Sequence, residues 1–446
     1  MRSIRPGNRR LSGHQLRATR CYGAAIGILL VIVLGLSGAA SAQEKNKDKR
    51  GLVWDNRPSI VFGKDIHLDL RMKLQTDWRT FDPDVPETLY DFRSLRFGLK
   101  GEVTKHFAYE FERELNQDFG FEDWKDVYVD WHTFDPFSIQ GGRFKMPFGA
   151  EQLTGPTDTD FAYRSLASSI IAPARDKGGM VYGRFFGRGL TYQAGVFDGD
   201  GDNGELQEKQ FVLEGQDVPK IGPSFAGRVT ATVLRALPVP DRLKSLRLGV
   251  AYTNAELPEG LNSLRGESVL GTAVYFEPVY VKGRRQRIGT ELEWTPGNFG
   301  IKAEWMQARE DRLGQSNRNA DLSDFLSTGW YVGGTWVVTG ESKGDSITPS
   351  KPLFKGGIGA IEVGARYDQL GFRSATSEGT AFTNPRSDHL VPNTDQVWTI
   401  GVNYFPNRWV RLVGNAIHEN FEDPNRSITP GTAGFWALLF RFQLVF

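Results

Sequence analysis

The stretch Gly434–Phe446 reads G-F-W-A-L-L-F-R-F-Q-L-V-F and decides how we expect the chain to fold. Large apolar side chains stand at every second position from Trp436 to Phe446, whereas Arg441 and Gln443 belong to the other register. Because alternate side chains of a strand point to opposite faces, one face is wholly apolar and the other is partly polar. A strand of a membrane barrel needs these two faces, one toward lipid and one toward the lumen. An amphipathic strand of a soluble sandwich is the alternative.

The amino-terminal residues have the organisation of an export signal. Six arginines and no acidic residue occur in residues 1–42, which also hold the apolar run Ala24–Leu36 and end in Ala40-Ser41-Ala42. A basic segment, an apolar run and an A-x-A site predict a secretory signal cleaved after Ala42. The apolar run is shorter than the ~20 residues of a membrane-spanning helix, and an uncleaved anchor is the alternative. Residues 43–64 are then a charged leader, and 65–446 form one domain.

The composition of the mature chain narrows the possible functions. Cleavage would remove the only cysteine, Cys21, and would leave 48 Lys and Arg against 53 Asp and Glu, a net charge of −5. Disulfides and thiolate metal sites are then excluded. A net acidic chain lacks the basic surface that a nucleic-acid partner requires. No later apolar run is long enough for a membrane helix, so the chain would cross a membrane as strands.

Strict alternation over Ile66–Arg79 predicts a strand longer than the five or six residues typical of globular proteins. Its length suits the ~10-residue segments of a membrane barrel. Similar segments raise the predicted number of strands to sixteen. The other fifteen are expected at about 94–103, 107–115, 125–133, 137–148, 179–186, 190–197, 225–234, 246–254, 286–295, 299–308, 328–339, 359–369, 397–405, 408–418 and 434–446.

The connectors between these segments alternate between short and long, as in barrels with short periplasmic turns and long external loops. Thr104–His106, Phe134–Pro136 and Pro406–Asn407 are short, and all fall on even connectors if Leu257–Val281 is one external loop. The apolar stretch Val269–Phe276 leaves open whether that loop contains a further strand. The predicted fold is an all-β, transmembrane, antiparallel barrel of sixteen strands, which leaves an aqueous channel.

Several motifs occur in an order that is more specific than any one of them. They are G-R-F-K-M-P-F-G at 142–149, Arg164-Ser165, P-x-R-D-x-G at 173–178, G-V-F-D-G at 195–199, G-W-Y-V at 329–332, T-G-E at 339–341 and E-x-x-A-R-Y at 362–367. Together they resemble the phosphate-selective porins of the O and P type over nearly all of the mature chain. The resemblance implies a homotrimer in the lipid of the bacterial outer membrane. It also implies an inward-folded third external loop that forms a constriction, and small anions such as phosphate as cargo.

Basic side chains of the lumen are the candidates for lining an anion path, because the arginine fork suits phosphate oxygens. Strand parity or the inward loop selects Arg71, Lys73, Arg96, Lys100, Lys145, Arg164, Arg175 and Arg228. For each of them the alternative is a solvated lumen charge without a role in selectivity.

Acidic residues complicate a selective anion path. Glu110, Glu112 and Glu114 share one face of the third strand, and lumen acids roughly equal lumen bases. A selective filter needs a ring of one charge. Basic first strands beside acidic third and fourth strands also fit a transverse field in a non-selective or weakly cation-preferring diffusion pore.

The remaining motifs predict no chemistry. Asp198–Gly204 reads D-G-D-G-D-N-G like a calcium loop, but Asn203 and Lys209 stand where an EF-hand needs glycine and glutamate. A flexible acidic external loop is the alternative. No nucleophile elbow, zinc-type histidine pair or P-loop occurs, so we expect no metal, no cofactor and no enzymatic activity. An outer-membrane barrel enzyme and a non-conducting structural barrel are the alternatives from other classes.

Overall fold

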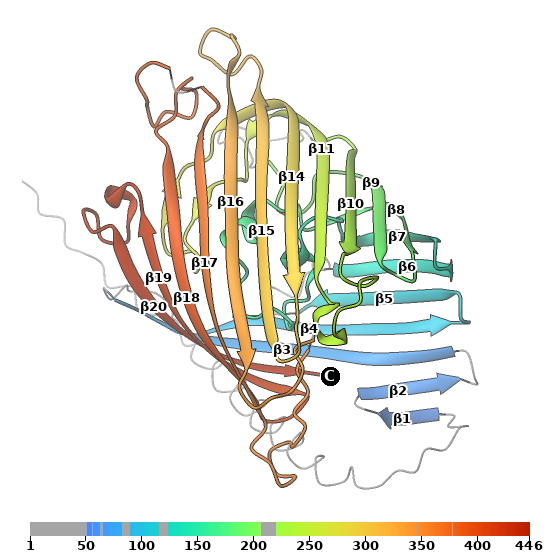
Figure 1. Ribbon diagram of the computed structural model, residues 1–446. Coiled ribbons are helices and arrows are strands. Elements are labelled where there is room, and N and C mark those ends of the chain that lie inside the picture. The colour runs from blue at the N-terminus through green and yellow to red at the C-terminus, as the bar shows by residue number, and fades with distance from the viewer. Residues whose placement is uncertain are drawn as a thin grey trace, which may run out of the picture. The chain divides into compact units, whose positions relative to one another are not determined.

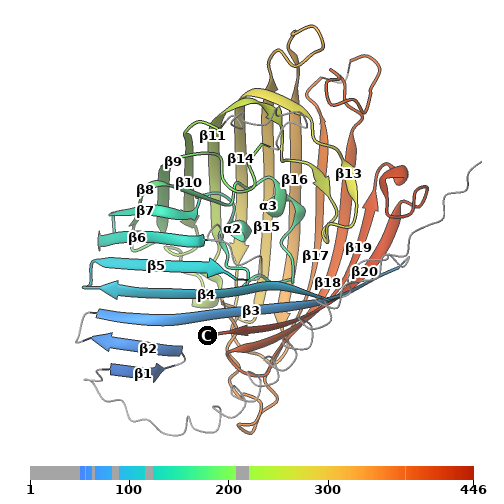
Figure 2. The ribbon, with the colours of Figure 1, turned by 180° about the vertical axis from the view of Figure 1, so that it is seen from behind.

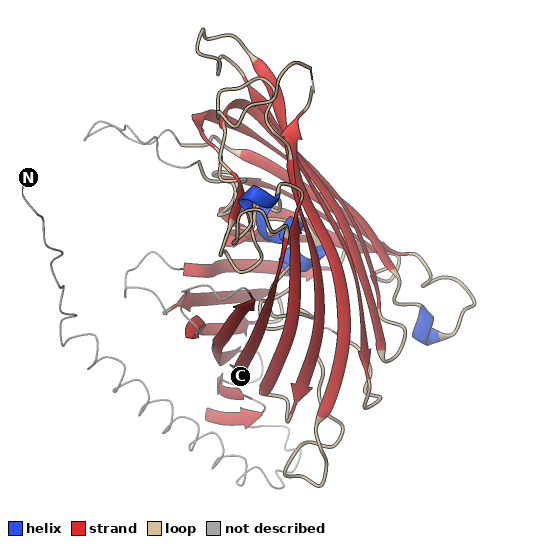
Figure 3. Ribbon diagram, turned by 90° about the vertical axis from the view of Figure 1, so that its left-hand side faces the viewer, coloured by secondary structure: helices blue, strands red, loops and turns tan. Residues whose placement is uncertain are grey.

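The computed structural model describes residues 51–55, 57–62, 66–82, 90–115, 124–206, 220–344, 346–376 and 378–446. These residues form one 18-stranded sheet, a separate two-stranded sheet and a few short helices (Figures 1 and 3). No described helix is long and apolar enough to cross a bilayer. The predicted signal 1–42 and the leader up to residue 50 lie outside the described residues.

Sixteen of the 18 strands close into a ring of antiparallel neighbours, because β20 pairs with β3 from Trp436↔Asp82 to Val445↔Lys73. In chain order they are β3 (Ile66–Asp82), β4 (Tyr90–Val103), β5 (Phe107–Glu114), β6 (Trp124–Phe134), β7 (Phe137–Lys145), β8 (Arg175–Phe185), β9 (Leu190–Phe197), β10 (Ser224–Thr232), β11 (Arg247–Leu261), β14 (Tyr280–Trp294), β15 (Phe299–Arg312), β16 (Leu322–Val337), β17 (Ala360–Ser374), β18 (Asn393–Phe405), β19 (Val410–Phe421) and β20 (Gly434–Val445). Every predicted strand corresponds to one of them, so the predicted sixteen-stranded barrel is confirmed.

Burial alternates along the strands as the sequence predicts. In β20, Trp436 and Phe440 are 48% and 51% exposed, whereas Phe435 and Leu439 are buried. The polar residues Arg441 and Gln443 belong to the buried register. The apolar face of each strand therefore points out of the barrel, and the mixed face points into it.

A hairpin that the sequence analysis did not anticipate lies beside the ring. Strands β1 (Gly51–Asp55) and β2 (Arg57–Phe62) pair with each other, and β2 pairs with β3 from Ser59↔Asp69 to Phe62↔Ile66. Since the pairing of β20 with β3 ends at Lys73, the hairpin prolongs the edge that β20 occupies. The rings of Trp54 and Phe446 lie 6.4 Å apart. Part of the predicted leader is thus ordered sheet.

The connector between β11 and β14 contains no strand of the ring, which agrees with its interpretation as a loop. Within it, β12 (Gly266–Glu267) and β13 (Val274–Phe276) form a small separate sheet. The ring of Tyr275 stacks on Phe421 at 5.1 Å, and the ring of Phe276 stacks on Phe372 at 5.0 Å. We call residues 262–279 the apolar loop. Its apolar stretch packs against inward-facing aromatic side chains of the barrel wall.

Candidate functional site: a basic cleft beside an inner loop

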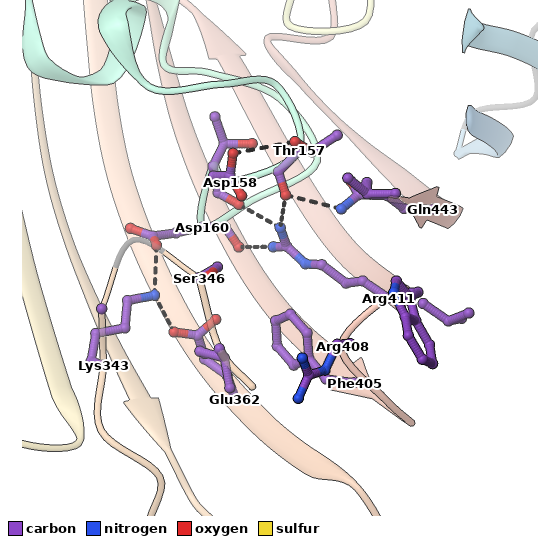
Figure 4. A pocket seen from close by; sticks show the side chains of 16 residues that line it. Thr157, Asp158, Asp160, Lys343, Ser346, Glu362, Phe405, Arg408, Arg411 and Gln443 are labelled. Carbon is purple, nitrogen blue, oxygen red and sulfur yellow. Dashed lines mark hydrogen bonds and ion pairs between the residues drawn. The ribbon is translucent and has the colours of Figure 1, made fainter. Parts of the chain in front are cut away.

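The connector between β7 and β8, residues 146–174, lies on the concave side of the sheet (Figure 2). Its backbone forms hydrogen bonds with side chains of the strands. We call it the inner loop; it includes the short helices α2 (Ala150–Leu153) and α3 (Leu166–Ile170). Arg411 of β19 donates hydrogen bonds to the backbone carbonyls of Thr159 and Asp160 at 2.7 and 2.9 Å (Figure 4). The buried guanidinium of Arg411 thus satisfies carbonyl groups of the inner loop that have no partner in a helix or sheet.

A carboxylate of the wall holds the start of the inner loop. The backbone N–H groups of Ala150 and Glu151 both donate to the Glu304 carboxylate at 2.8 Å. Gly149 precedes them at φ +73°, and a Cβ there would lie 2.7 Å from the Met306 side chain. Glycine adopts this positive φ without steric cost, which explains the last glycine of the 142–149 motif.

Ion pairs hold the middle of the inner loop. Lys343, from the turn between β16 and β17, contacts the carboxylates of Asp160 and Glu362 (Figure 4). Lys302 lies 3.0 Å from the other oxygen of Asp160. Burial opposes ionisation of Asp160, but the two ammonium groups outweigh burial and lower its pKa below the ordinary value. These contacts enclose a cavity of about 190 Å³ between the inner loop and the turns.

The candidate site is a second cavity, of about 260 Å³, between the inner loop and the wall at β3 and β4. We call it the basic cleft. Its charged lining consists of Arg93, Arg96, Lys125, Arg164 and Arg441 with the carboxylate of Glu114; its other lining residues are neutral. The arrangement gathers basic side chains beside the inner loop.

Two basic side chains at the inner loop bind carbonyl groups. Arg164 donates to the carbonyls of Glu151 and Thr154 at 3.0 and 2.6 Å. Lys145 donates to three consecutive carbonyls that end at Thr154, at 2.6 to 3.1 Å. Within the described residues, neither side chain forms a salt bridge with a carboxylate. The guanidinium of Arg164, which lines the basic cleft, therefore keeps its charge without a carboxylate partner in the described part of the chain.

Burial lowers the pKa of Arg164 to about 10, although nearby Glu151 opposes the shift; the charges of Arg175 and Arg96 add to it. Arg164 therefore stays protonated at neutral pH.

Tyr163 organises the far side of the cleft. Its ring lies between two guanidinium groups, 5.3 Å from that of Arg93 and 5.2 Å from that of Arg441. Its hydroxyl donates to Asp77 at 3.2 Å, and Arg441 binds both oxygens of Asp77 at 2.6 and 2.7 Å. The face of the Tyr163 ring thus contacts the guanidinium of Arg93, and the carboxylate of Asp77 neutralises Arg441.

The structure brings Arg96, Arg164, Lys145 and Arg175 close to the inner loop, while the other four predicted site residues lie elsewhere on the wall. Six of the eight form salt bridges: Arg71 with Glu110, Lys73 with Glu112, Arg96 with Glu112 and Glu114, Lys100 with Glu110, Arg175 with Asp126, and Arg228 with Glu291. The bases of β3 and β4 therefore neutralise the acids of β5. The separate basic and acidic walls of a transverse field do not form here.

Sequence reasoning missed Arg93, Lys125 and Arg441. The pairing of β3 with β4 shifts register between Gln75 and Thr76, and Arg93 stands at this irregularity. Simple alternation along β4 therefore assigns Arg93 to the wrong face. Arg441 could have been predicted from the sequence, because it interrupts the apolar pattern of the last strand. Lys125 stands at the start of β6, where parity is least reliable.

The calcium-like loop uses its carboxylates in ion pairs with arginine. Asp200 is buried and lies 2.7 Å from Arg285 and 2.5 Å from Arg287. Burial opposes ionisation of Asp200, but these guanidinium groups lower its pKa. Asp202 lies 2.5 Å from Arg143. Among the described residues, no group of three or more His, Cys, Asp or Glu side chains is arranged to hold a metal ion.

Comparison with known sequences gives one family and one relative. A family profile described as phosphate-selective porin O and P matches residues 66–446. An uncharacterised protein of Caulobacter vibrioides (strain ATCC 19089 / CIP 103742 / CB 15) is 25% identical over 346 residues. The match covers 72% of this chain and 64% of that protein, so the chain spans less than two-thirds of its relative's length.

Comparison with solved structures gives the same architecture. In-vitro folded OmpT, an outer membrane protein of Vibrio cholerae, has a TM-score of 0.52 at 11% identity, over 85% of this chain and 98% of that chain. A trimer form of that protein gives 0.51 at 12%, over 86% and 100%. The outer membrane channel DcaP of Acinetobacter baumannii gives 0.50 at 9%, over 89% and 100%. At these identities the similarity shows the fold alone.

Proposed function

Because the chain belongs to the phosphate-selective porin O and P family, we propose that it forms a water-filled channel for passive diffusion of small anions, phosphate among them. It is a porin of the bacterial outer membrane, as the family and the outer-membrane fold neighbours indicate. In this proposal residues 1–42 are the export signal and 43–64 the leader. The inner loop is the constriction, and the chain has no catalytic role.

The basic cleft is the observation that supports anion preference. Its lining carries five basic side chains and one carboxylate. Arg441 and Arg96 are paired with acidic residues, whereas Arg164 forms no salt bridge among the described residues. An anion that reaches Arg164 competes with carbonyl groups, which are weaker partners than carboxylates. The cavity of about 260 Å³ has room for a small anion with several waters, each of which takes ~30 Å³ in the liquid.

Planar-bilayer conductance tests this function. In a potassium chloride gradient we expect a reversal potential of the sign that marks anion preference. Addition of phosphate should reduce the chloride current, because phosphate occupies the basic cleft for longer than chloride does. A reversal potential of the opposite sign would overturn the anion preference. An unchanged chloride current would remove phosphate as the preferred solute.

A non-selective diffusion pore is the second candidate. The salt bridges of Arg71, Lys73 and Lys100 with strand β5 support it, because a neutralised wall selects neither sign of ion. In such a pore, replacing Arg164 would leave the reversal potential unchanged.

We also propose that the protein is a homotrimer surrounded by outer-membrane lipid. The family and the trimer form of the fold neighbour OmpT support this state. Mass measurement of the detergent-solubilised protein tests it, and a monomeric mass would overturn it.

A further inference from the structure

Charge is distributed unevenly between the two ends of the barrel. Seven connectors join the strands at the end where β3 begins, and five of them have two to four residues, whereas all eight connectors at the opposite end have seven or more. We call the first of these the turn end, because short turns mark the periplasmic side of such barrels. The turn-end connectors hold nine Lys and Arg against four Asp and Glu, but those at the opposite end hold seven against 22. The turn end is therefore basic although the mature chain is acidic.

An apolar groove of about 640 Å³ lies on the outer wall of strands β15 to β18 and reaches the turn end at Pro296. Gly334 of β16 and Ala365 of β17 are small residues of the outward register that stand directly opposite each other and form its floor. A Cβ added at Gly334 would meet a single atom, at 3.8 Å. The exposed side chains of Ile400 and Val402 border the groove. It has the apolar lining and the open side that a hydrocarbon chain needs.

Two aromatic side chains stand where the groove meets the turns. Phe299 is the first residue of β15, and Trp336 is the last but one of β16. Their rings stack at 6.0 Å, and the two residues are 47% and 43% exposed. Exposed aromatic side chains of membrane proteins gather at the level of the lipid headgroups. The groove therefore runs from the headgroup level into the hydrocarbon region.

Bases lie on both sides of the turn at the mouth of the groove. The turns β10–β11, β14–β15 and β16–β17 follow one another around this part of the ring. Arg242 of the first precedes Leu243, whose carbonyl accepts a hydrogen bond from the indole of Trp294, the last residue of β14, at 3.1 Å. Lys351 of the third accepts a hydrogen bond at its carbonyl from the N–H of Gly359, directly before β17, at 3.0 Å.

These two bases are not neutralised by the protein. The side chains of Arg242 and Lys351 belong to exposed residues and have no hydrogen bond or ion pair within the described part of the chain. The described carboxylates of the same turns have other partners, since Asp241 binds Lys244 and Glu341 accepts hydrogen bonds from hydroxyl groups. Two positive charges therefore remain for an anion at this end of the groove.

We propose that the groove and the two bases form a binding site for an anionic glycerophospholipid. One acyl chain lies in the groove, and the headgroup lies at the turn end in the field of Arg242 and Lys351. The inference rests on the outer-membrane porin of the proposed function and specifies the lipid that its wall binds. Inorganic phosphate or an acidic protein would satisfy the bases but leave the groove unfilled, whereas a lipid occupies both. Each base should favour an anionic headgroup about fivefold.

Native mass spectrometry of the full porin in detergent tests the headgroup preference. With 1-palmitoyl-2-oleoyl lipids that differ only in the headgroup, we expect phosphatidylglycerol to bind several-fold more tightly than phosphatidylcholine. The double variant Arg242→Gln/Lys351→Gln should abolish this preference. Its control Lys220→Gln/Arg318→Gln removes two exposed charges at the opposite end and should keep it. Equal binding of the two lipids by the unmodified protein, or an unchanged preference in the first variant, would overturn the proposal.

Filling the groove tests the acyl-chain position without a change of charge. Gly334→Trp should lower the binding of both lipids several-fold, and Ala365→Phe should do the same from the neighbouring strand. Val250→Trp, at an exposed outward position of β11, is the matched control and should leave binding unchanged. The heat-dependent mobility of each variant in detergent gels reports that its barrel has folded. Unchanged phosphatidylglycerol binding in the folded groove variants would overturn the proposal.

Lipid binding is read from mass, whereas the anion preference of the pore is read from the reversal potential. A channel without anion preference can still bind phosphatidylglycerol, and an anion-selective channel can fail to bind it. Failure of the lipid site and failure of the proposed function are therefore distinguishable.

Discussion

At the scale of single residues, Arg164 carries the proposed selectivity, because it projects from the inner loop into the basic cleft. Arg164→Ala should move the reversal potential toward that of a non-selective pore and weaken phosphate block about tenfold or more. That factor corresponds to loss of one charge-assisted hydrogen bond, worth about 1.5–3 kcal/mol. Planar-bilayer recording measures both effects.

The control is Arg188→Ala, because Arg188 lies in an exposed turn and its side chain is 61% exposed. Equal behaviour of the two variants would contradict the role of Arg164.

The same side chain predicts a dependence on pH. The pKa of Arg164 is lowered to about 10, and a basic group loses its charge as the pH rises through its pKa. Anion preference should therefore hold from pH 6 to 9 and decline as the pH passes 10. Reversal potentials recorded across this range measure it. A midpoint near pH 7 would assign the selectivity to a different group.

At this scale the sequence predicts which face of a strand a side chain occupies, but it does not predict which residue that side chain pairs with. Two-residue alternation correctly placed Arg71, Lys73 and Lys100 in the lumen. Their pairing with glutamates of β5 depends on which residues of adjacent strands stand side by side. That register is set by turns and bulges, such as the shift between Gln75 and Thr76, and alternation alone carries no information about it.

At the scale of elements, the structure explains the length of the turn between β16 and β17. Residues 340–358 form a longer connector than the short turns Phe134–Pro136 and Pro406–Asn407. The structure shows Lys343 of this turn bound to Asp160 of the inner loop and to Glu362. The extra length lets Lys343 reach Asp160, so that a turn at one end of the barrel holds the inner loop. A length count has no means to predict this contact.

Lys343→Ala tests this turn. The change leaves Glu362, 1% exposed, without its ammonium partner, and removing one member of a buried pair costs about 3–5 kcal/mol. We expect a less rigid inner loop, seen as larger current fluctuations and faster proteolysis within residues 146–174. Lys355→Ala in the same turn is the control. Current noise identical to that of the unmodified protein would show that Lys343 does not hold the inner loop.

The apolar loop is a second element with a measurable consequence. Its aromatic side chains pack on Phe372 and Phe421 inside the barrel, and Val269 donates its N–H to Glu419 at 2.9 Å. Replacing residues 264–277 by a short Gly-Ser linker should raise single-channel conductance, because the loop occupies lumen that water would fill. Unchanged conductance would mean that ions pass elsewhere. The apolar stretch was visible in the sequence, but alternation does not distinguish a strand that meets lipid from a segment that packs inside.

At the scale of the whole molecule, the architecture was the most predictable property. Sixteen alternating segments and the contrast between short and long connectors were enough for the barrel. The hairpin β1–β2 escaped prediction because its strands have five and six residues, too few for a convincing alternation. It is stabilised by the edge of β3, which exists only once the ring has formed.

Because β20 pairs with β3, the order of strands around the ring would be the same if the chain began at a different strand. Since the two ends of the ring are neighbours and Phe446 reaches the aromatic ring of Trp54, a tether across the seam would cost little distance. A circularly permuted gene, cut at any tight turn such as Phe134–Pro136, would encode the same cylinder.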